Sequence, residues 1–141
     1  MDHIVYLDFK AKEMDRLLDG SKNMIIRGAA GRKLPHGRVF EGDRLFFVNN
    51  NGEGHVKAMA NVTSAFHSGK MDKETSEKLV AEHMAKLQLT PAQQKRWAGK
   101  RYLVLIEVDN MQPVEPFGFD RSDYSNMDDW LPVEDIDKLK K

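Results

Sequence analysis

The side chains best suited to hold an anion in this chain belong to two basic residues of one short segment, Lys22 and Arg27. A lysine supplies a mobile point charge and an arginine a planar fork of donors, and together they suit a phosphate or a carboxylate. Gly20 is placed to end a helix, so the backbone turns just before Lys22. Residues an odd number apart in a strand point to opposite faces, but Lys22 precedes the regular part of the next strand. Spacing alone also fits a simpler interpretation, in which both are solvated surface charges.

The same segment opens a basic run. Between residues 20 and 44, six basic residues face two acidic ones, whereas between residues 107 and 137 ten acidic residues face Arg121 alone. The whole chain has 22 basic and 22 acidic residues, so its formal net charge is +0. A neutral protein built this way presents a positive face unless the two segments lie together and cancel. The residues predicted to bind a ligand are Lys22, Arg27, Arg32, Lys33, His36 and Arg38.

Apolar periodicity and turn residues predict the elements that position these side chains. The continuous run 45–48 is typical of a strand covered on both faces, and Asn51-Gly52 after it is a hairpin signal. Thr90, Pro91 and Gln93 form a capping-box pattern at the start of a short helix. The glycine-rich stretch 28–37 predicts an exposed loop. Strands are expected over 4–7, 24–26, 45–48, 55–62 and 102–108, and helices around 14–19, 73–87 and 91–99.

The order of these elements predicts an α+β fold with a small mixed β-barrel. Hairpins dominate and strand–helix–strand units do not recur, which argues against a doubly wound parallel sheet. A chain of 141 residues fits one domain of ordinary size. We expect residues 1–110 to form the barrel domain and residues 111–141 to form an irregular acidic extension packed on it. A turn of helix is expected after Pro132.

Aromatic side chains occur beside basic ones in a second stretch. Lys95-Arg96 precede Trp97, and Lys100-Arg101 follow it. Such interleaving suits nucleic acid, which is bound by stacking together with phosphate contacts. We favour the structural interpretation, in which Trp97 packs its short helix onto the barrel. The aromatic residues of the tail are expected to fix it to the core in the same way: Phe117, Phe119, Tyr124 and Trp130.

The amino-acid composition argues against disulfide, metal and cofactor sites, and against a membrane or exported location. Cysteine is absent, so there is no disulfide or thiolate metal site, and the five histidines form no pair at metal-ligand spacing. Phosphate-loop and dinucleotide motifs are missing, so no cofactor is expected. No apolar run approaches the ~20 residues that span a bilayer, and the first residues lack a signal-peptide pattern. We therefore predict a soluble, cytoplasmic protein that has no membrane partner.

The octet 20–27 resembles the signature of ASCH domains, a family of the PUA-like superfamily, which reads Gly-x-Lys-x-x-Glu-x-Arg. The chain matches this signature at Gly20, Lys22 and Arg27, and the order of elements from residue 4 to residue 108 is similar too. The resemblance implies a small PUA-like mixed β-barrel with flanking helices. It also implies a cleft beside the signature that takes RNA or a nucleotide-like ligand.

The chain departs from the signature at Ile25, where the family usually has glutamate. A branch of the family that hydrolyses acetylated cytidine uses the signature lysine, a threonine at this place and a glutamate on the helical insertion. Isoleucine neither polarises a substrate nor transfers a proton, which favours binding over hydrolysis. If the chain is an enzyme, the resemblance implies Lys22 as base or electrophile, with Glu82, or else Glu74 or Glu77, as the assisting carboxylate.

Three functions from different classes stay open on these grounds. The favoured hypothesis is a binding module whose basic cleft beside Gly20–Arg27 takes RNA or a nucleotide-like small molecule. The second is a hydrolase that acts on modified nucleosides, or a ribonuclease. The third is a protein-interaction module in which the acidic tail contacts a protein partner.

Overall fold

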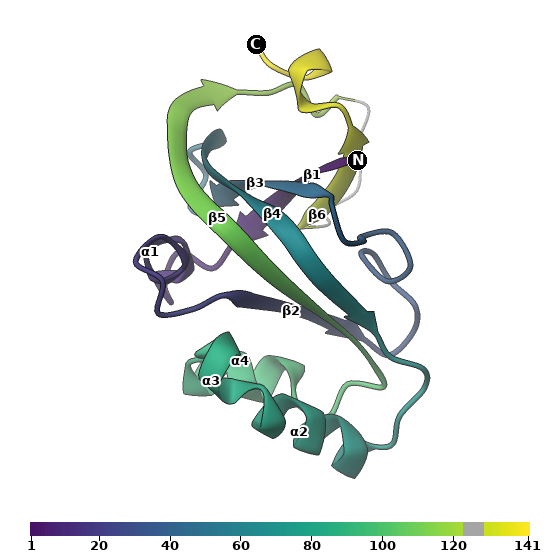
Figure 1. Ribbon diagram of the computed structural model, residues 1–141. Helices are drawn as coiled ribbons and strands as arrows, with labels where there is room; N and C mark the ends of the chain where they lie inside the picture. Colours follow the sequence, from purple (N-terminus) through teal and green to yellow (C-terminus); the bar gives the residue numbers. More distant parts are fainter. Residues whose placement is uncertain (123–128) are drawn as a thin grey trace.

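A computed structural model describes residues 1–122 and 129–141 of the chain, and Figure 1 shows its elements. The strands are β1 (Asp2–Leu7), β2 (Met24–Ala29), β3 (Arg44–Asn49), β4 (His55–His67), β5 (Tyr102–Gly118) and β6 (Trp130–Glu134). The helices are α1 (Glu13–Leu18), α2 (Lys73–Glu82), α3 (Met84–Leu87), α4 (Pro91–Trp97) and the 3-10 turn η1 (Ile136–Lys138). Helices α2, α3 and α4 lie together beside β2, at the end of the molecule opposite η1.

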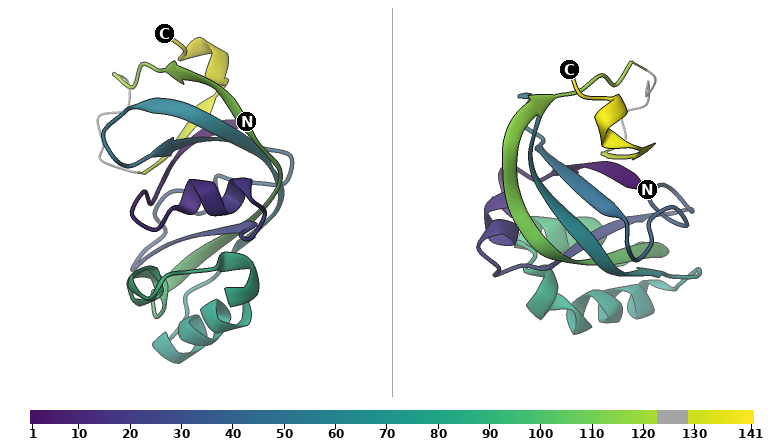
Figure 2. Two further views of the ribbon diagram at one scale, coloured as in Figure 1. Left: turned by 90° about the vertical axis from the view of Figure 1, so that its left-hand side faces the viewer. Right: turned by 45° about the horizontal axis from the view of Figure 1, so that its top comes forward.

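The strands form one six-stranded sheet in the order β2-β5-β4-β3-β1-β6, which curls into a half-barrel (Figure 2). β1 and β3 pair in parallel, with His3 opposite Leu45, and the other neighbours pair antiparallel. The predicted α+β class with a small barrel-like sheet is confirmed. The sheet is open, however, because no pairing joins β2 to β6 among the described residues.

Core residues lie on both faces of the sheet, and this explains two of the sequence patterns. Phe47 packs inside the curl and Phe46 packs on the other face, so the run 45–48 is apolar throughout. The alternation predicted in β4 is also correct, because Val56, Ala58, Ala60 and Val62 are all buried. A third cluster joins α2, α3 and α4 to β2 and β5, and it includes Trp97.

Strand β5 is much longer than predicted and corrects the expectation of an irregular tail. It continues past Asn110 to Gly118, and β6 then pairs with β1. Pro113 and Pro116 are tolerated because β2 pairs only with the first part of β5, so no described strand pairs with one edge of the later part. Trp130 and Phe119 are buried, which agrees with their predicted packing role, and Tyr124 lies outside the described residues.

Strand β2 is also longer than predicted, because Gly28 and Ala29 belong to it and not to the loop. A side chain at Gly28 would bring its Cβ to 2.6 Å from Leu103 Cδ2 and 2.9 Å from the Tyr102 carbonyl oxygen. Glycine is therefore required by the close approach of β5. The loop that follows begins at Ala30, and it borders the site described below.

The helices agree with the predicted pattern, with one interruption. The expected helix 73–87 breaks at His83 into α2 and α3, and α4 begins with the complete capping box of Thr90 and Gln93. The described part of the chain holds no helix that is long and apolar enough to cross a membrane.

Candidate anion-binding cleft

Arg27 lies on β2 and is the most constrained cation of the site. The residue is only 6% exposed, so its charge needs partners inside the protein. Nη1 donates to the Ile26 carbonyl oxygen at 2.8 Å, and Nη2 donates to the Tyr6 carbonyl oxygen at 2.7 Å. Nε has no hydrogen-bond partner among the described residues, although Asp129 Oδ2 lies 3.3 Å away as an ion pair. One donor of a buried guanidinium thus remains incompletely satisfied.

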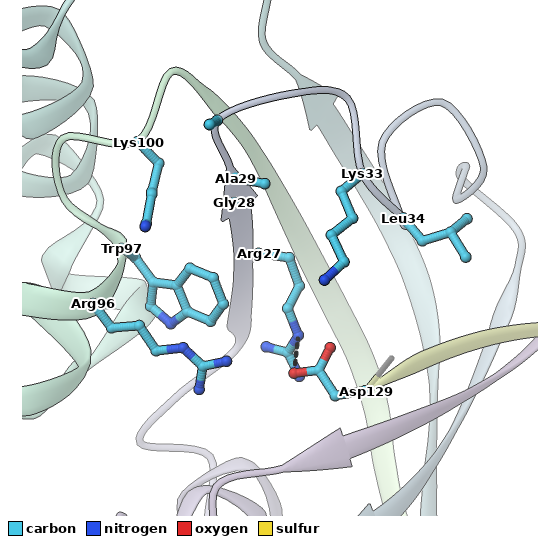
Figure 3. Close-up of a pocket in the computed structure, with 10 residues that line it drawn as sticks. Arg27, Gly28, Ala29, Lys33, Leu34, Arg96, Trp97, Lys100 and Asp129 are labelled. Carbon is cyan, nitrogen blue, oxygen red and sulfur yellow. Dashed lines mark ion pairs between the residues drawn. The ribbon is translucent and has the colours of Figure 1, made fainter. Parts of the chain in front are cut away.

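A cleft with a volume of about 390 Å³ opens beside this guanidinium (Figure 3). Its walls come from the end of β2, the loop after β2, the end of α4 and the turn before β5. The lining residues are Arg27, Gly28, Ala29, Ala30, Lys33, Leu34, Arg96, Trp97, Lys100 and Asp129. Four of them are cations, and Asp129 is the one carboxylate among the lining residues that the structure describes. Figure 3 shows the Lys33 amino group and the Asp129 carboxylate both directed toward Arg27.

The indole ring of Trp97 forms one wall of the cleft. The capping box of Thr90 fixes the start of α4, and Trp97 at its end is 7% exposed and packs against the helical cluster. The guanidinium carbon of Arg96 lies 4.4 Å from the ring centroid, and that of Arg27 lies 5.9 Å from it. The predicted packing role is therefore correct, and the same ring also lies in the cleft between two cations.

Lys22 lies apart from the lining of this cleft and is buried, with 2% of its surface exposed. Its Nζ donates to the Leu87 carbonyl oxygen and lies 3.3 Å from Glu13 Oε2. Burial lowers the pKa of Lys22 below its ordinary value, and the Glu13 carboxylate opposes that shift. Lys22 therefore ties β2 to α1 and α3 in this structure, whereas the sequence predicted that it faces a ligand.

A small chamber of about 20 Å³ continues the cleft inward. Arg27, Arg96, Trp97 and Asp129 line both spaces, and the chamber adds further polar groups to its lining. These groups are Tyr6, Asp8, Glu13, Asn50 and Gln93. A volume of this size holds about one water molecule. Cations therefore predominate in the lining of the cleft, whereas the chamber adds carboxylates and amides to the two arginines that it shares with the cleft.

The other residues predicted to bind a ligand lie outside the lining. His36 Nε2 lies 2.8 Å from the Ser68 carbonyl oxygen, Arg32 lies over the Tyr102 ring, and Arg38 is exposed. Glu82 is exposed at the end of α2, and the carboxylate that pairs with Lys22 is Glu13. Of the predicted residues, the structure brings Arg27 and Lys33 together in the cleft.

Sequence reasoning missed Asp129 and Glu13, and it undervalued the stretch around Trp97. A signal for Arg96 and Lys100 was present in their interleaving with aromatic side chains. Asp129 belongs to an acidic segment that is distant in sequence, and only the pairing of β6 with β1 brings it to the cleft. No local pattern marks it.

Solved structures show which known fold this arrangement matches. The crystal structure of ASCH from Zymomonas mobilis aligns with a TM-score of 0.67 over 97% of this chain and 91% of that chain, at 13% identity. This chain has an ASCH fold. A serine-to-alanine variant of the same protein aligns with a TM-score of 0.68 at 14% identity, over 97% of this chain and 91% of that one. A tyrosine-to-phenylalanine variant aligns with a TM-score of 0.68 at 14% identity, over 97% of this chain and 93% of that one.

No protein-family model matches the chain, and no curated protein matches it either. The ASCH fold is therefore recognised from structure and not from overall sequence. In this ASCH fold the three residues that resemble the signature have separate positions. Gly20 turns the chain after α1 with a positive φ of 83°, Lys22 is buried against Glu13, and Arg27 lies in the cleft. Ile25, where the signature has glutamate, is fully buried in the core.

Proposed function

We propose that the cleft binds the phosphate of an RNA or of a nucleotide-like ligand. The observation that carries the proposal is Arg27, a buried guanidinium whose Nε lacks a hydrogen-bond partner among the described residues and whose side chain lines the cleft. A phosphate oxygen would satisfy this donor with a charge-assisted hydrogen bond. Lys33, Arg96 and Lys100 surround the same space and would add charge stabilisation.

The Trp97 wall favours a nucleotide over a simple anion. A base has a flat π-face, and base–aromatic stacking contributes about 1–3 kcal/mol per base. The ring borders the space between Arg96 and Arg27, so a ligand that places its phosphate at Arg27 would bring an attached ring system to Trp97. The ASCH fold is compatible with such a ligand, because it is a PUA-like fold.

Calorimetric titration with adenosine 5′-monophosphate tests the proposal. We expect binding that weakens strongly between about 50 mM and about 200 mM salt, because phosphate contacts release counterions. Arg27→Ala removes the buried donor and should weaken binding about tenfold or more, since hydrogen bonds to charged groups contribute about 1.5–3 kcal/mol. Arg96→Ala with Lys100→Ala is a second variant, and it changes residues at the margin of the cleft instead of its buried part.

Lys78→Ala is the matched control, because Lys78 is exposed on α2 and does not line the cleft. It removes one positive charge without changing the site, so its affinity should equal that of the wild type. Affinity that is insensitive to salt, or equal in all variants, would rule out the cleft as the phosphate site.

A second function, hydrolysis of a modified nucleoside or of RNA, is favoured by one observation. The inner chamber places Asp8 and Glu13 beside Arg27 and has room for about one water molecule. A carboxylate there would accept a proton from water as the water attacks a group held at Arg27, and the carboxylic acid formed would return that proton to the leaving amine or oxygen as the scissile bond breaks. In this hypothesis Asp8 or Glu13 takes the role that the sequence suggested for Glu82, and Lys22 holds Glu13 in place.

Turnover assays on an acetylated cytidine and on a short labelled RNA distinguish this function from binding alone. If the protein is a hydrolase, Asp8→Asn should lower kcat by about 10²-fold or more, the usual size of a general-base contribution. Glu82→Gln should leave kcat unchanged. No turnover of either substrate by the wild-type protein would leave binding as the function of the cleft.

A further inference from the structure

A row of side chains lies beside the loop between β2 and β3, and the function proposed above does not use it. The row consists of Arg32, Tyr102, His36, His67 and Phe40, in that order of contact. The Arg32 guanidinium carbon lies 5.7 Å from the Tyr102 ring centroid. The ring centroids are 5.7 Å apart for Tyr102 and His36, 5.4 Å for His36 and His67, and 5.4 Å for His67 and Phe40. We call this set the ring row.

The middle of the ring row is held rigidly by backbone contacts. His36 Nε2 donates to the Ser68 carbonyl oxygen at 2.8 Å, and His67 Nε2 donates to the Val39 carbonyl oxygen at 2.8 Å. His67 Nδ1 accepts from the Gly37 amide at 2.9 Å, which fixes its tautomer. These contacts attach the loop to the end of β4. These contacts account for the two histidines in the middle of the row, but not for Arg32 and Phe40 at its ends.

The two ends of the ring row are exposed. Arg32 is exposed, and 54% of the Phe40 surface is open, although Phe40 contacts His67. An exposed phenylalanine gains little from folding, so packing alone does not account for it. A rigid aromatic surface with a cation at one end and an open ring at the other suits planar, anionic partners.

The ring row is continuous with the cleft. Lys33 and Leu34, which line the cleft, directly follow Arg32 in the chain. Ala29 also lines the cleft, and it is the register partner of Tyr102 in the pairing of β2 with β5. A chain molecule that leaves the cleft past Lys33 would therefore reach Tyr102 first. Two further exposed cations lie near members of the row in sequence, because Arg101 directly precedes Tyr102 and Arg38 lies two residues from both His36 and Phe40.

We infer that the ring row binds the bases of single-stranded RNA that extends out of the cleft. The inference rests on the proposed function, and it narrows the ligand class from any nucleotide to an oligonucleotide. Stacking on aromatic side chains, together with cations along the backbone, is the usual way in which proteins hold single strands. The rigid middle of the row means that little conformational freedom is lost on binding.

The test compares a labelled single-stranded RNA octamer, measured by fluorescence anisotropy, with adenosine 5′-monophosphate, measured by calorimetry. The wild-type protein should bind the octamer more tightly than the mononucleotide. Phe40→Ala and Arg32→Ala should each weaken octamer binding fivefold or more and leave mononucleotide binding unchanged. Arg27→Ala should weaken the binding of both ligands.

Phe66→Ala is a matched control, because Phe66 is 51% exposed and precedes His67 on β4, so it points to the opposite face of that strand. It should bind both ligands as the wild type does. Wild-type octamer affinity in both Phe40→Ala and Arg32→Ala, with Arg27→Ala impaired, would reject the ring row and keep the cleft. Wild-type affinity for both ligands in Arg27→Ala would reject the cleft itself.

Discussion

The Oδ2 atom of Asp129 lies 3.3 Å from the Nε atom of Arg27, so a carboxylate of the protein occupies the position from which an anionic ligand would reach this guanidinium. Asp129 is 40% exposed in its side chain, whereas Arg27 is 7% exposed. The arginine is thus fixed and the aspartate is the more accessible member of the pair. The proposed ligand and Asp129 would compete for the same donor.

We therefore expect Asp129→Asn to raise the affinity for inorganic phosphate. The substitution removes the competing negative charge and keeps the size of the side chain. Solvent reaches the Asp129 carboxylate and screens the pair, and solvent-screened ion pairs contribute about 0.2–1 kcal/mol, so the increase should be modest, about two- to fivefold at low salt. Calorimetric titration with phosphate measures it. Reduced affinity would mean that the aspartate contacts the ligand and does not compete with it.

Lys22→Met should destabilise the protein strongly. It leaves the Glu13 carboxylate buried without its cation, and breaking a buried pair from one side costs about 3–5 kcal/mol. Urea unfolding followed by tryptophan fluorescence measures the change in the free energy of unfolding. The double variant Lys22→Met with Glu13→Gln should recover part of the loss. Equal stability of Lys22→Met and the wild type would show that the pair contributes nothing.

The stability of the fold should decrease as the pH falls below about 6.5, and His3 is the reason. His3 Nδ1 accepts from the Trp130 indole at 3.0 Å, and its Nε2 donates to Asp43 at 2.8 Å. Burial lowers the pKa of His3, although Asp43 partly offsets the shift. The unfolded chain therefore binds a proton first, and folding loses free energy as the pH falls from the unfolded pKa toward the folded one.

Urea unfolding at about pH 7.5 and about pH 5.5 measures this loss, and His3→Gln provides the comparison. The substitution removes the titrating ring but keeps a donor and an acceptor. It should lower the free energy of unfolding at neutral pH, and it should reduce the difference in that free energy between the two pH values. Burial alone would raise the pKa of Asp43, but the hydrogen bonds from His3 and from the Phe40 amide outweigh this effect and hold the pKa below its ordinary value. Asp43 therefore stays charged at both pH values. If the stability of His3→Gln changes with pH as much as that of the wild type, then another group causes the loss of stability at low pH.

Deleting residues 111–141 should abolish cooperative unfolding of the remaining chain. The deletion removes β6 and the fully buried Trp130, which packs in the core inside the curl. Loss of a buried tryptophan side chain alone costs about 3–5 kcal/mol, a large part of an ordinary domain's stability. We therefore propose that residues 1–110 and 111–141 form one folding unit. A truncated chain that unfolds cooperatively would instead favour the acidic tail as a separate surface for a protein partner.

Local sequence patterns were sufficient for most elements of the fold, because each depends on neighbouring residues. The run 45–48 and the capping box of Thr90 and Gln93 are of this kind. The lengths of β2 and β5 were not predictable, since proline and glycine are tolerated there only because of how neighbouring strands pair. Gly28 illustrates this, because a larger residue there would collide with Leu103, which is distant in sequence.

The candidate site was harder to predict, because it joins segments that are far apart in the chain. The signature resemblance led to Arg27, and the basic run led to Lys33. The same resemblance led to Lys22 as a ligand contact, whereas its partner Glu13 lies on α1 and holds it in the interior. Asp129 could be placed only by the pairing of β6 with β1, which no local pattern indicates.

That pairing also sets the order in which a newly made chain can complete its structure. Val5 is matched with Trp130, so β1 receives this neighbour only after all the residues between the two strands have been translated. Contacts of such large sequence separation slow folding, because a long loop must close before they form. Until Asp129 and β6 have been made, β1 lacks this neighbour and the cleft lacks this carboxylate. The cleft therefore gains Asp129 together with β6, in the same step that we expect to complete the core.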